Sequence, residues 1–248
     1  ERSRIGEERF RREHECEFLI FDETLISSLT LADMEGIPPV ETTGQVRWYK
    51  RPTPGHTYMV SLDPSMGTGG DFAAIQIFEL PTFEQVGEWQ HNQTPMNQQV
   101  RILQGINKHI HDTIMEADST ANPQIFYSME NNSIGEAALM RVMDIGEENI
   151  MGMFLSEPIR KGHRRKFRRG FNTTAKHKID ACTKFKELVE NDKMKINSAL
   201  LISELKDFVA SGLSYKAKPG QHDDLVSSCL LMTRMMKVLA DFDPKIFE

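Results

Sequence analysis

Short apolar runs, each closed by turn residues, follow one another in the chain after residue 56. The runs "TYMVSLD" (57–63), "FAAIQIFEL" (72–80) and "EQVGEWQ" (84–90) have the length and the hydrophobic pattern of β-strands. The residues "PTF" between the second and third runs are typical of a turn. The pattern therefore predicts three successive strands.

A longer periodic pattern of apolar residues begins near residue 96 and continues to about residue 117. Leu103, Ile106, Ile110 and Ile114 recur at intervals of three and four residues, which places them on one face of a helix. Further on, the predicted elements are a strand at 124–130, a helix around 134–145, a strand at 149–155, a helix at 174–190 with the stripe Ile179, Cys182, Phe185 and Leu188, two short elements, and a terminal helix at 223–240. Three strands followed by alternating helices and strands predict an α/β domain with a mixed central sheet flanked by helices.

Residues 1–50 differ in character from the remainder. They are charged at first and then apolar, and proline and glycine are dense over residues 36–56, which is typical of a linker or boundary. The first segment is short for an independent domain. We therefore expect residues 1–50 to be the end of a preceding domain with its linker, and residues 51–248 to be the main domain.

Composition narrows the class of protein. The chain has 248 residues, 39% of them hydrophobic and 27% charged, as expected for a soluble globular protein. No apolar run reaches the ~20 residues that a membrane-spanning helix needs, so no membrane partner is expected. Cys16, Cys182 and Cys229 lack CxxC spacing, which favours unpaired thiols in a reducing, cytoplasmic setting.

Two acidic residues end predicted strands. Asp63 closes the first strand and Glu130 closes the strand at 124–130, and ligands of α/β folds bind in the crevice at such strand ends. Ser61 and Ser128 share a face with these acids, and we expect such small residues to leave room for a bound group. Each acid also has a structural alternative, because Asp63 can begin a turn and Glu130 can lie in a solvent-facing loop.

Further acids begin the terminal helix. Asp223 and Asp224 precede a strongly apolar run, and as a plain cap they would complement the helix dipole. If this helix begins at the same crevice, three or four carboxylates converge there, and a divalent cation such as Mg²⁺ or Mn²⁺ would relieve their repulsion. Two such ions about 3.5–4 Å apart support phosphodiester hydrolysis. Asp71, after the glycine-rich "GTGGD", is either an auxiliary ligand or a turn aspartate.

The net charge of −6 conceals a strongly basic stretch. Residues 158–179 contain nine lysines and arginines and no acidic residue, which leaves about −15 on the rest of the chain. A solvated loop is the structural alternative, but the opposite sign of this stretch favours contact with a phosphate backbone. The predicted DNA contacts are Arg160, Lys161, Arg164, Arg165, Lys166, Arg168, Arg169, Lys176 and Lys178.

Three motifs occur along the chain in this order: "YMVSLDPSMGTGGDFAAIQIF", "IFYSMENNSIG" and "GQHDDLVSS". In these motifs the chain resembles the nuclease domain of a tailed-bacteriophage terminase large subunit, most closely the branch of large myophages. The similarity covers about residues 50–240, and "FRREHECEFLIFDETLIS" resembles the segment just after the terminase ATPase domain. The resemblance implies an RNase H-like fold with the strands of Asp63 and Glu130 adjacent. It also implies an acidic core of Asp63, Glu130 and the Asp223–Asp224 pair, with Asp71 at an acidic position after the glycine loop.

The resemblance further implies a Mg²⁺- or Mn²⁺-dependent endonuclease that cleaves concatemeric viral double-stranded DNA during genome packaging, with low sequence specificity. Its implied partners are the portal protein, the small terminase and its own ATPase domain, in the cytoplasm of the infected bacterial host. Two alternatives stay open from the residues alone. One is a junction resolvase or strand-transfer enzyme on the same fold, and the other is a DNA-binding or docking module that does not cleave.

Overall fold

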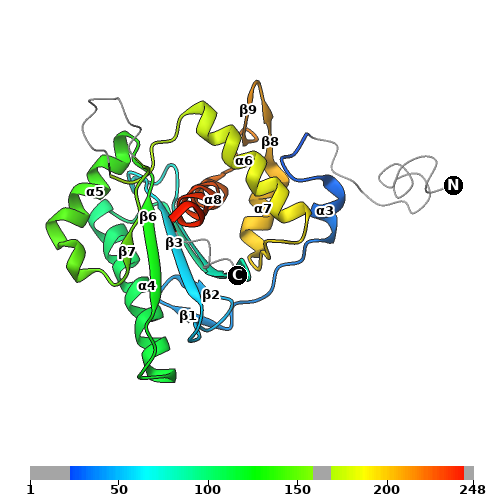
Figure 1. Cartoon of the computed structure of the whole chain (residues 1–248). Coiled ribbons are helices and arrows are strands. Elements are labelled where there is room, and N and C mark those ends of the chain that lie inside the picture. Colours follow the sequence, from blue (N-terminus) through cyan, green and yellow to red (C-terminus); the bar gives the residue numbers. More distant parts are fainter. Residues whose placement is uncertain (1–22, 159–168, 243–248) are drawn as a thin grey trace.

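The structure is a computed structural model, and it describes residues 23–158 and 169–242 (Figure 1). In chain order the elements are α3 (Ser28–Asp33), β1 (Glu41–Thr43), β2 (Val46–Trp48), β3 (Thr57–Asp63), β4 (Ala73–Leu80), β5 (Glu84–His91), α4 (Met96–Ala117), β6 (Gln124–Met129), α5 (Ser133–Ile145), the 3₁₀ turn η1 (Glu147–Asn149), β7 (Met153–Phe154), α6 (Ala175–Glu190), α7 (Ala199–Asp207), β8 (Phe208–Ser211), β9 (Ser214–Ala217) and α8 (Asp224–Phe242).

A mixed sheet forms the centre of the described part of the chain. Its seven strands lie in the order β1-β2-β5-β4-β3-β6-β7. The pairs from β1 to β3 are antiparallel, whereas β3 pairs with β6, and β6 with β7, in parallel. This confirms the predicted α/β architecture, in which three successive strands form a meander and helical crossovers add the parallel strands.

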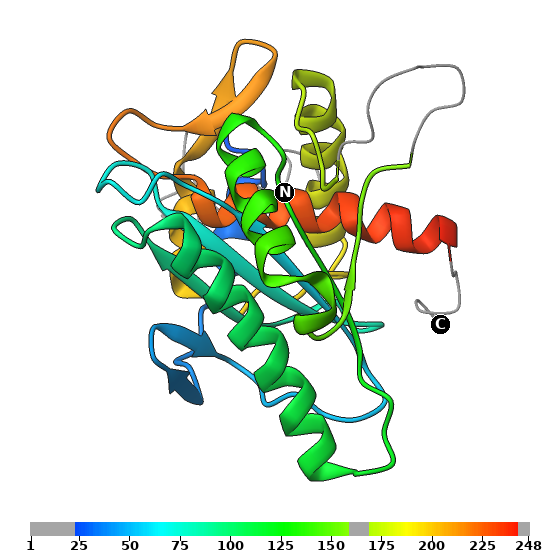
Figure 2. The ribbon, with the colours of Figure 1, turned by 90° about the vertical axis from the view of Figure 1, so that its left-hand side faces the viewer.

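Helices cover both faces of this sheet. In Figure 2, α4 and α5 lie in front of the strands, and α8 crosses on the far side. Successive strand residues point to opposite faces. On β3, Tyr58, Val60 and Leu62 therefore join the core under α4 and α5, while Met59 joins the core under α6, α7 and α8. By the same alternation, Asp63 belongs to the face that α8 covers.

The serines of β3 and β6 have a different role from the one expected. Ser61 and Ser128 are fully buried. The Oγ of Ser61 lies 2.9 Å from the Oγ of Ser228 on α8, and the Oγ of Ser128 donates to the Leu155 carbonyl at 2.8 Å. The expectation that these residues leave room for a bound group was wrong, because the space beside Ser61 admits helix α8.

Two predicted elements need correction. The strand expected at 149–155 has only the residues of β7, because η1 and Gly152 interrupt it: Gly152 has a φ of +103°, and a Cβ there would lie 2.6 Å from the Ile125 carbonyl oxygen. On α6, Cys182, Phe185 and Leu188 are buried as predicted, but Ile179 is 37% exposed. The helix predicted at 96–117 is confirmed as α4.

The first described residues pack against the rest of the fold. Leu25, Ile26 and Leu31 are buried in the core on the α8 side, and Trp48 of β2 is buried on the other side. None of the helices in residues 23–158 and 169–242 is long and apolar enough to cross a membrane.

Candidate active site

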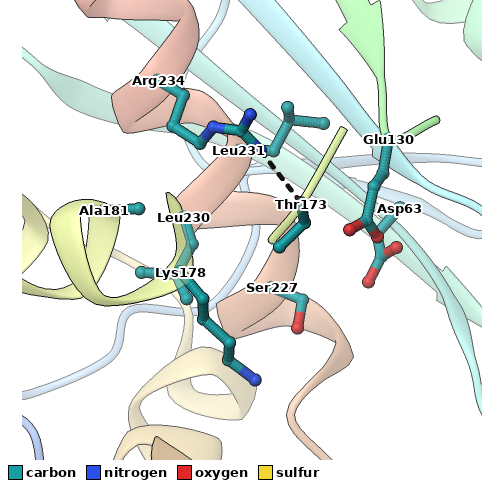
Figure 3. Close-up of a pocket in the computed structure, with 9 residues that line it drawn as sticks. All are labelled: Asp63, Glu130, Thr173, Lys178, Ala181, Ser227, Leu230, Leu231 and Arg234. Carbon is teal, nitrogen blue, oxygen red and sulfur yellow. Dashed lines mark hydrogen bonds between the residues drawn. The ribbon is translucent and has the colours of Figure 1, made fainter. Parts of the chain in front are cut away.

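Asp63 and Glu130 lie side by side because their strands are parallel neighbours. In the register of β3 and β6, Leu62 is opposite Met129, and the Glu130 backbone N–H donates to the Leu62 carbonyl at 3.1 Å. Both strands therefore end at the same edge of the sheet. Their carboxylates point toward one another in Figure 3.

This pair concentrates negative charge. The pKa of the Asp63 carboxyl is raised well above its usual range, first by burial, then by the charge of Glu130 and a side-chain hydrogen bond with it, and further by Asp224 and Asp223. The four acids predicted for the site thus act on one another electrostatically. Folding has assembled a set of like charges that would repel one another if all were ionised without a cation.

The α5 N-terminus fixes the orientation of Glu130. Asn132 caps α5 by accepting from the N–H groups of Ile134 and Gly135, and its Nδ2 donates to Glu130 Oε2 at 3.1 Å. A Cβ at Gly135 would lie 1.8 Å from the Glu130 carbonyl oxygen. Only glycine permits this close approach, so the local sequence holds α5 directly against the end of β6.

A cavity of about 170 Å³ adjoins the paired carboxylates. Its lining residues are Asp63, Glu130, Thr173, Lys178, Ala181, Ser227, Leu230, Leu231 and Arg234 (Figure 3). Lys178 comes from α6, and the last four residues come from α8. One wall is acidic, and the wall from α6 and α8 offers cations and hydroxyl groups. The pocket can therefore accept an anionic group next to a carboxylate-bound cation.

Asp224 begins helix α8 just outside this lining. Its carboxylate bonds to the backbone N–H of Phe72, and its pKa is raised to about 6, chiefly by burial. Its Oδ2 is buried, lies 3.5 Å from His222 Nδ1, and accepts no hydrogen bond within the described part of the chain. A buried carboxylate oxygen that accepts no hydrogen bond is costly, as expected of a group that serves to bind a ligand.

Asp223 and Asp71 lie near the site but outside the lining of the cavity. Asp223 Oδ2 accepts from the Ala217 N–H at 3.3 Å and lies 3.8 Å from Lys178 Nζ. Asp71 is exposed in the turn before β4, and its charge helps to raise the pKa of Asp224. Neither residue lines the cavity.

These carboxylates suit a divalent cation by chemistry and charge. Their donors are all oxygen, which Mg²⁺ and Mn²⁺ prefer. A cation would also relieve the repulsion between neighbouring acids that, after burial, raises the pKa of Asp63 and Asp224. Within the described residues, no three His, Cys, Asp or Glu side chains form a group that could already hold an ion. The preassembled part is therefore the Asp63–Glu130 pair, with the Asp224 oxygen nearby.

The predicted DNA contacts are only partly described. Arg160, Lys161, Arg164, Arg165, Lys166 and Arg168 lie outside the described residues. Arg169 pairs with Glu147 and lies 5.8 Å from the centre of the Phe154 ring. Lys176 is exposed, and Lys178 lines the cavity opposite the acids.

Arg234 and Glu204 were not identified from the sequence. Arg234 on α8 donates to Thr173 Oγ1 at 2.9 Å and to the Asn172 carbonyl at 3.0 Å, and it pairs with Glu157. It therefore links Glu157, just before the basic stretch, and Asn172 and Thr173, within that stretch, to the helix that carries Asp224. Arg234 lies seven residues after Ser227 on α8, which is a weak periodic signal in the sequence. No sequence signal marks Glu204, because the partners of Glu204 come from α8 and β5.

Comparisons with known proteins agree with this geometry. The family model described as "Terminase RNaseH-like domain" matches residues 60–235. The large terminase nuclease from thermophilic phage G20c is similar in structure, with a TM-score of 0.61 and 18% identity over 84% of this chain and 96% of that one. The same nuclease with bound magnesium has a TM-score of 0.61 and 17% identity over 84% and 95% of the two chains.

A more distant similarity extends to a terminase nuclease domain of human cytomegalovirus, solved with manganese and an inhibitor. It has a TM-score of 0.55 and 14% identity over 85% of this chain and 94% of that one. Together with the family match, these similarities show that the mixed sheet and its flanking helices form an RNase H-like fold, as the sequence predicted.

Proposed function

The chain belongs to the family of terminase RNase H-like domains, and we propose that it is a metal-dependent endonuclease that cleaves double-stranded DNA. The paired carboxylates at the ends of β3 and β6 are the observation that carries this proposal. They lie beside a cavity whose opposite wall is cationic, as a site for a phosphodiester group requires.

Asp63, Glu130 and Asp224 would hold the cation, with Asp223 and Asp71 as additional acidic residues, and Mg²⁺ or Mn²⁺ fits these oxygen donors. The relative from phage G20c, solved with bound magnesium, supports this class of ion. When bound, two such ions neutralise charge on the phosphodiester and lower the pKa of water, which makes hydrolysis feasible at neutral pH.

The chain's own residues would position the substrate. Lys178 lines the same cavity as Asp63 and Glu130, and it can hold a phosphate oxygen there while Thr173 and Ser227 offer hydroxyl groups. Asn132 keeps Glu130 oriented through its hydrogen bond to Oε2. The proposed contacts to the DNA backbone are Arg160, Lys161, Arg164, Arg165, Lys166, Arg168, Arg169, Lys176 and Lys178, and such contacts give binding with low sequence specificity.

The biological setting is the finer part of the proposal. The domain, predicted from the sequence over residues 51–248, would cut concatemeric viral DNA during genome packaging in the cytoplasm of an infected bacterium, as part of a large-myophage terminase. Residues 1–50 would connect it to a preceding ATPase domain, but strands β1 and β2 and the buried Leu25, Ile26 and Leu31 belong to the nuclease fold itself. The portal protein, the small terminase and the ATPase domain would be its partners.

Incubation of supercoiled plasmid with the protein tests the activity. In Mn²⁺ or Mg²⁺ we expect nicked and linear products, which EDTA prevents. Asp63→Ala should abolish cleavage while the far-ultraviolet circular dichroism spectrum and the thermal unfolding stay cooperative. Asp118→Ala, at an exposed aspartate after α4, is the matched control and should cleave normally. Cleavage by Asp63→Ala at the wild-type rate, or an intact plasmid with both ions, would contradict the proposal.

A further inference from the structure

The two acidic residues at the start of helix α8 do not cap their own helix. The Asp223 carbonyl accepts from the Ser227 N–H at 2.7 Å, so Asp223 occupies the N-cap position and Asp224 is the first helical residue. An N-cap aspartate normally accepts from the second or third N–H of its helix, which here belong to Leu225 and Val226. Asp223 instead accepts from the Ala217 N–H, and Asp224 bonds to the Phe72 N–H.

A residue from a different helix accepts these two N–H groups. Glu204 of α7 accepts from the Val226 N–H through Oε2 at 3.1 Å, and the Leu225 N–H also bonds to its carboxylate. Its Oε1 accepts from Gln90 Nε2 of β5 at 2.9 Å. Glu204 thus connects α7 and β5 with the first turn of α8.

Four of the other helices differ from α8 in this respect, whereas α4 begins after Pro95 and has no side-chain cap. Each of four helices takes its cap from the side chain of its own N-cap residue: Ser27 for α3, Asn132 for α5, Thr174 for α6 and Ser198 for α7. Helix α8 has an aspartate available for this role and does not use it. The side chains of Asp223 and Asp224 are therefore not engaged by their own helix.

We propose that Glu204 is a positioning residue, which caps α8 from α7 so that Asp223 and Asp224 remain directed toward the acidic site. This inference rests on the proposed function, in which these aspartates help to hold a divalent cation. Without Glu204, the Asp223 side chain would be free to take the ordinary N-cap role and accept the N–H groups of the first turn. It would then leave its contacts with Ala217 and Lys178. Asp224 would shift with the first turn.

The local electrostatics agree with a role beyond stability. Glu204 is buried near Asp224, and burial, more than the charge of Asp224, raises its pKa to about 8, although the hydrogen bonds from Val226, Gln90 and Leu225 oppose this rise. A buried acid placed this close to Asp224 is unfavourable for folding alone. Local arrangements that oppose stability are common at functional sites.

Amide hydrogen exchange at Val226 tests the cap without any metal. In the metal-free protein we expect Asp223→Ala to leave this amide as protected as in the wild type, because Glu204 still accepts its hydrogen. Glu204→Ala should retain partial protection through Asp223, and the double variant should lose it, with exchange at least tenfold faster than in either single variant. Faster exchange in Asp223→Ala alone would overturn the inference, and this arm holds even if Glu204→Ala does not fold.

Titration calorimetry with Mn²⁺ alone tests the consequence for the site. Glu204→Ala should raise the Mn²⁺ Kd at least threefold, and Glu204→Gln, whose amide oxygen can still accept from Val226, should restore most of the affinity. Ser27→Ala removes the side-chain cap of another helix, α3, and should leave the Kd unchanged. An unchanged Kd in Glu204→Ala, or an equal rise in Ser27→Ala, would overturn the positioning role. Absence of Mn²⁺ binding in the wild type would instead contradict the proposed function. The exchange experiment would still show whether Glu204 caps α8.

Discussion

Replacement of Asp224 by asparagine should stabilise the metal-free protein at neutral pH and also impair cleavage. Burial is the main reason that the pKa of this carboxyl rises from 3.8 to about 6 in the folded state, and its side chain is only 13% exposed. Because the folded-state pKa is higher than the unfolded one, protonation of Asp224 stabilises the fold below about pH 4. That stabilisation is lost as the pH rises through about 6.

The size of the effect follows from the two pKa values. The difference between 3.8 and about 6 corresponds to about 3 kcal/mol at pH 7.5, where wild-type Asp224 is ionised. Asparagine is never ionised and can still accept from the Phe72 N–H, although a weaker hydrogen bond could cost about 1 kcal/mol. We therefore expect Asp224→Asn to raise the free energy of unfolding by about 1–3 kcal/mol at pH 7.5 and to have little effect at pH 4.

Urea unfolding in EDTA at pH 4 and pH 7.5 measures this difference. Asp118→Asn is the control, because hydrogen bonds from Thr120 lower the pKa of this exposed carboxyl, and its replacement should not stabilise the protein at pH 7.5. Added Mn²⁺ should then stabilise the wild type more than Asp224→Asn. A loss of stability in Asp224→Asn at pH 7.5, or an equal gain at both pH values, would refute the reasoning.

Two further substitutions probe the walls of the site. Lys178→Glu should weaken DNA binding in fluorescence anisotropy and reduce the slope of log K against log[salt] by about one, because Lys178 is a cation in the lining of the cavity beside the paired acids. An unchanged slope would exclude a phosphate contact, and Lys193→Glu, at an exposed lysine, is the control. Gly135→Ala should destabilise the protein by about 1–3 kcal/mol in urea unfolding and reduce cleavage, because a Cβ would lie 1.8 Å from the Glu130 carbonyl oxygen. The control is Gly105→Ala, because Gly105 of α4 is exposed and an added Cβ would meet open space, so this change should not destabilise the fold. Equal effects of Gly135→Ala and Gly105→Ala would contradict the account.

The fold was largely predictable from local patterns. The strands of the central meander and helix α4 have clear hydrophobic periods, and their ends coincide with turn residues. The strand expected at 149–155 was overestimated because apolar composition does not reveal a positive φ at Gly152. Ile179 matches the helical stripe but lies at the exposed start of α6, where burial depends on the neighbouring elements and not on the period.

The site was predictable as a set of residue types and only partly as an arrangement. Asp63 and Glu130 end apolar strands, and their resemblance to a known motif implied that these strands are adjacent. The packing of Ser61 against α8 could not be inferred from the sequence, because it depends on how closely a helix approaches the sheet. The cap of α8 by Glu204 was equally hidden, since capping patterns describe contacts within a few residues and this acceptor lies 20 or more positions before its donors.

Anomalous diffraction from crystals soaked in Mn²⁺ tests the central claim most directly. The account predicts a manganese peak between the carboxylates of Asp63 and Glu130, with oxygen distances of about 2.0–2.2 Å, which is close to the range for small divalent cations. The peak should disappear in Asp63→Ala crystals prepared in the same way. Manganese bound elsewhere, or no peak at these carboxylates at saturating concentration, would contradict a metal-dependent nuclease site in this fold.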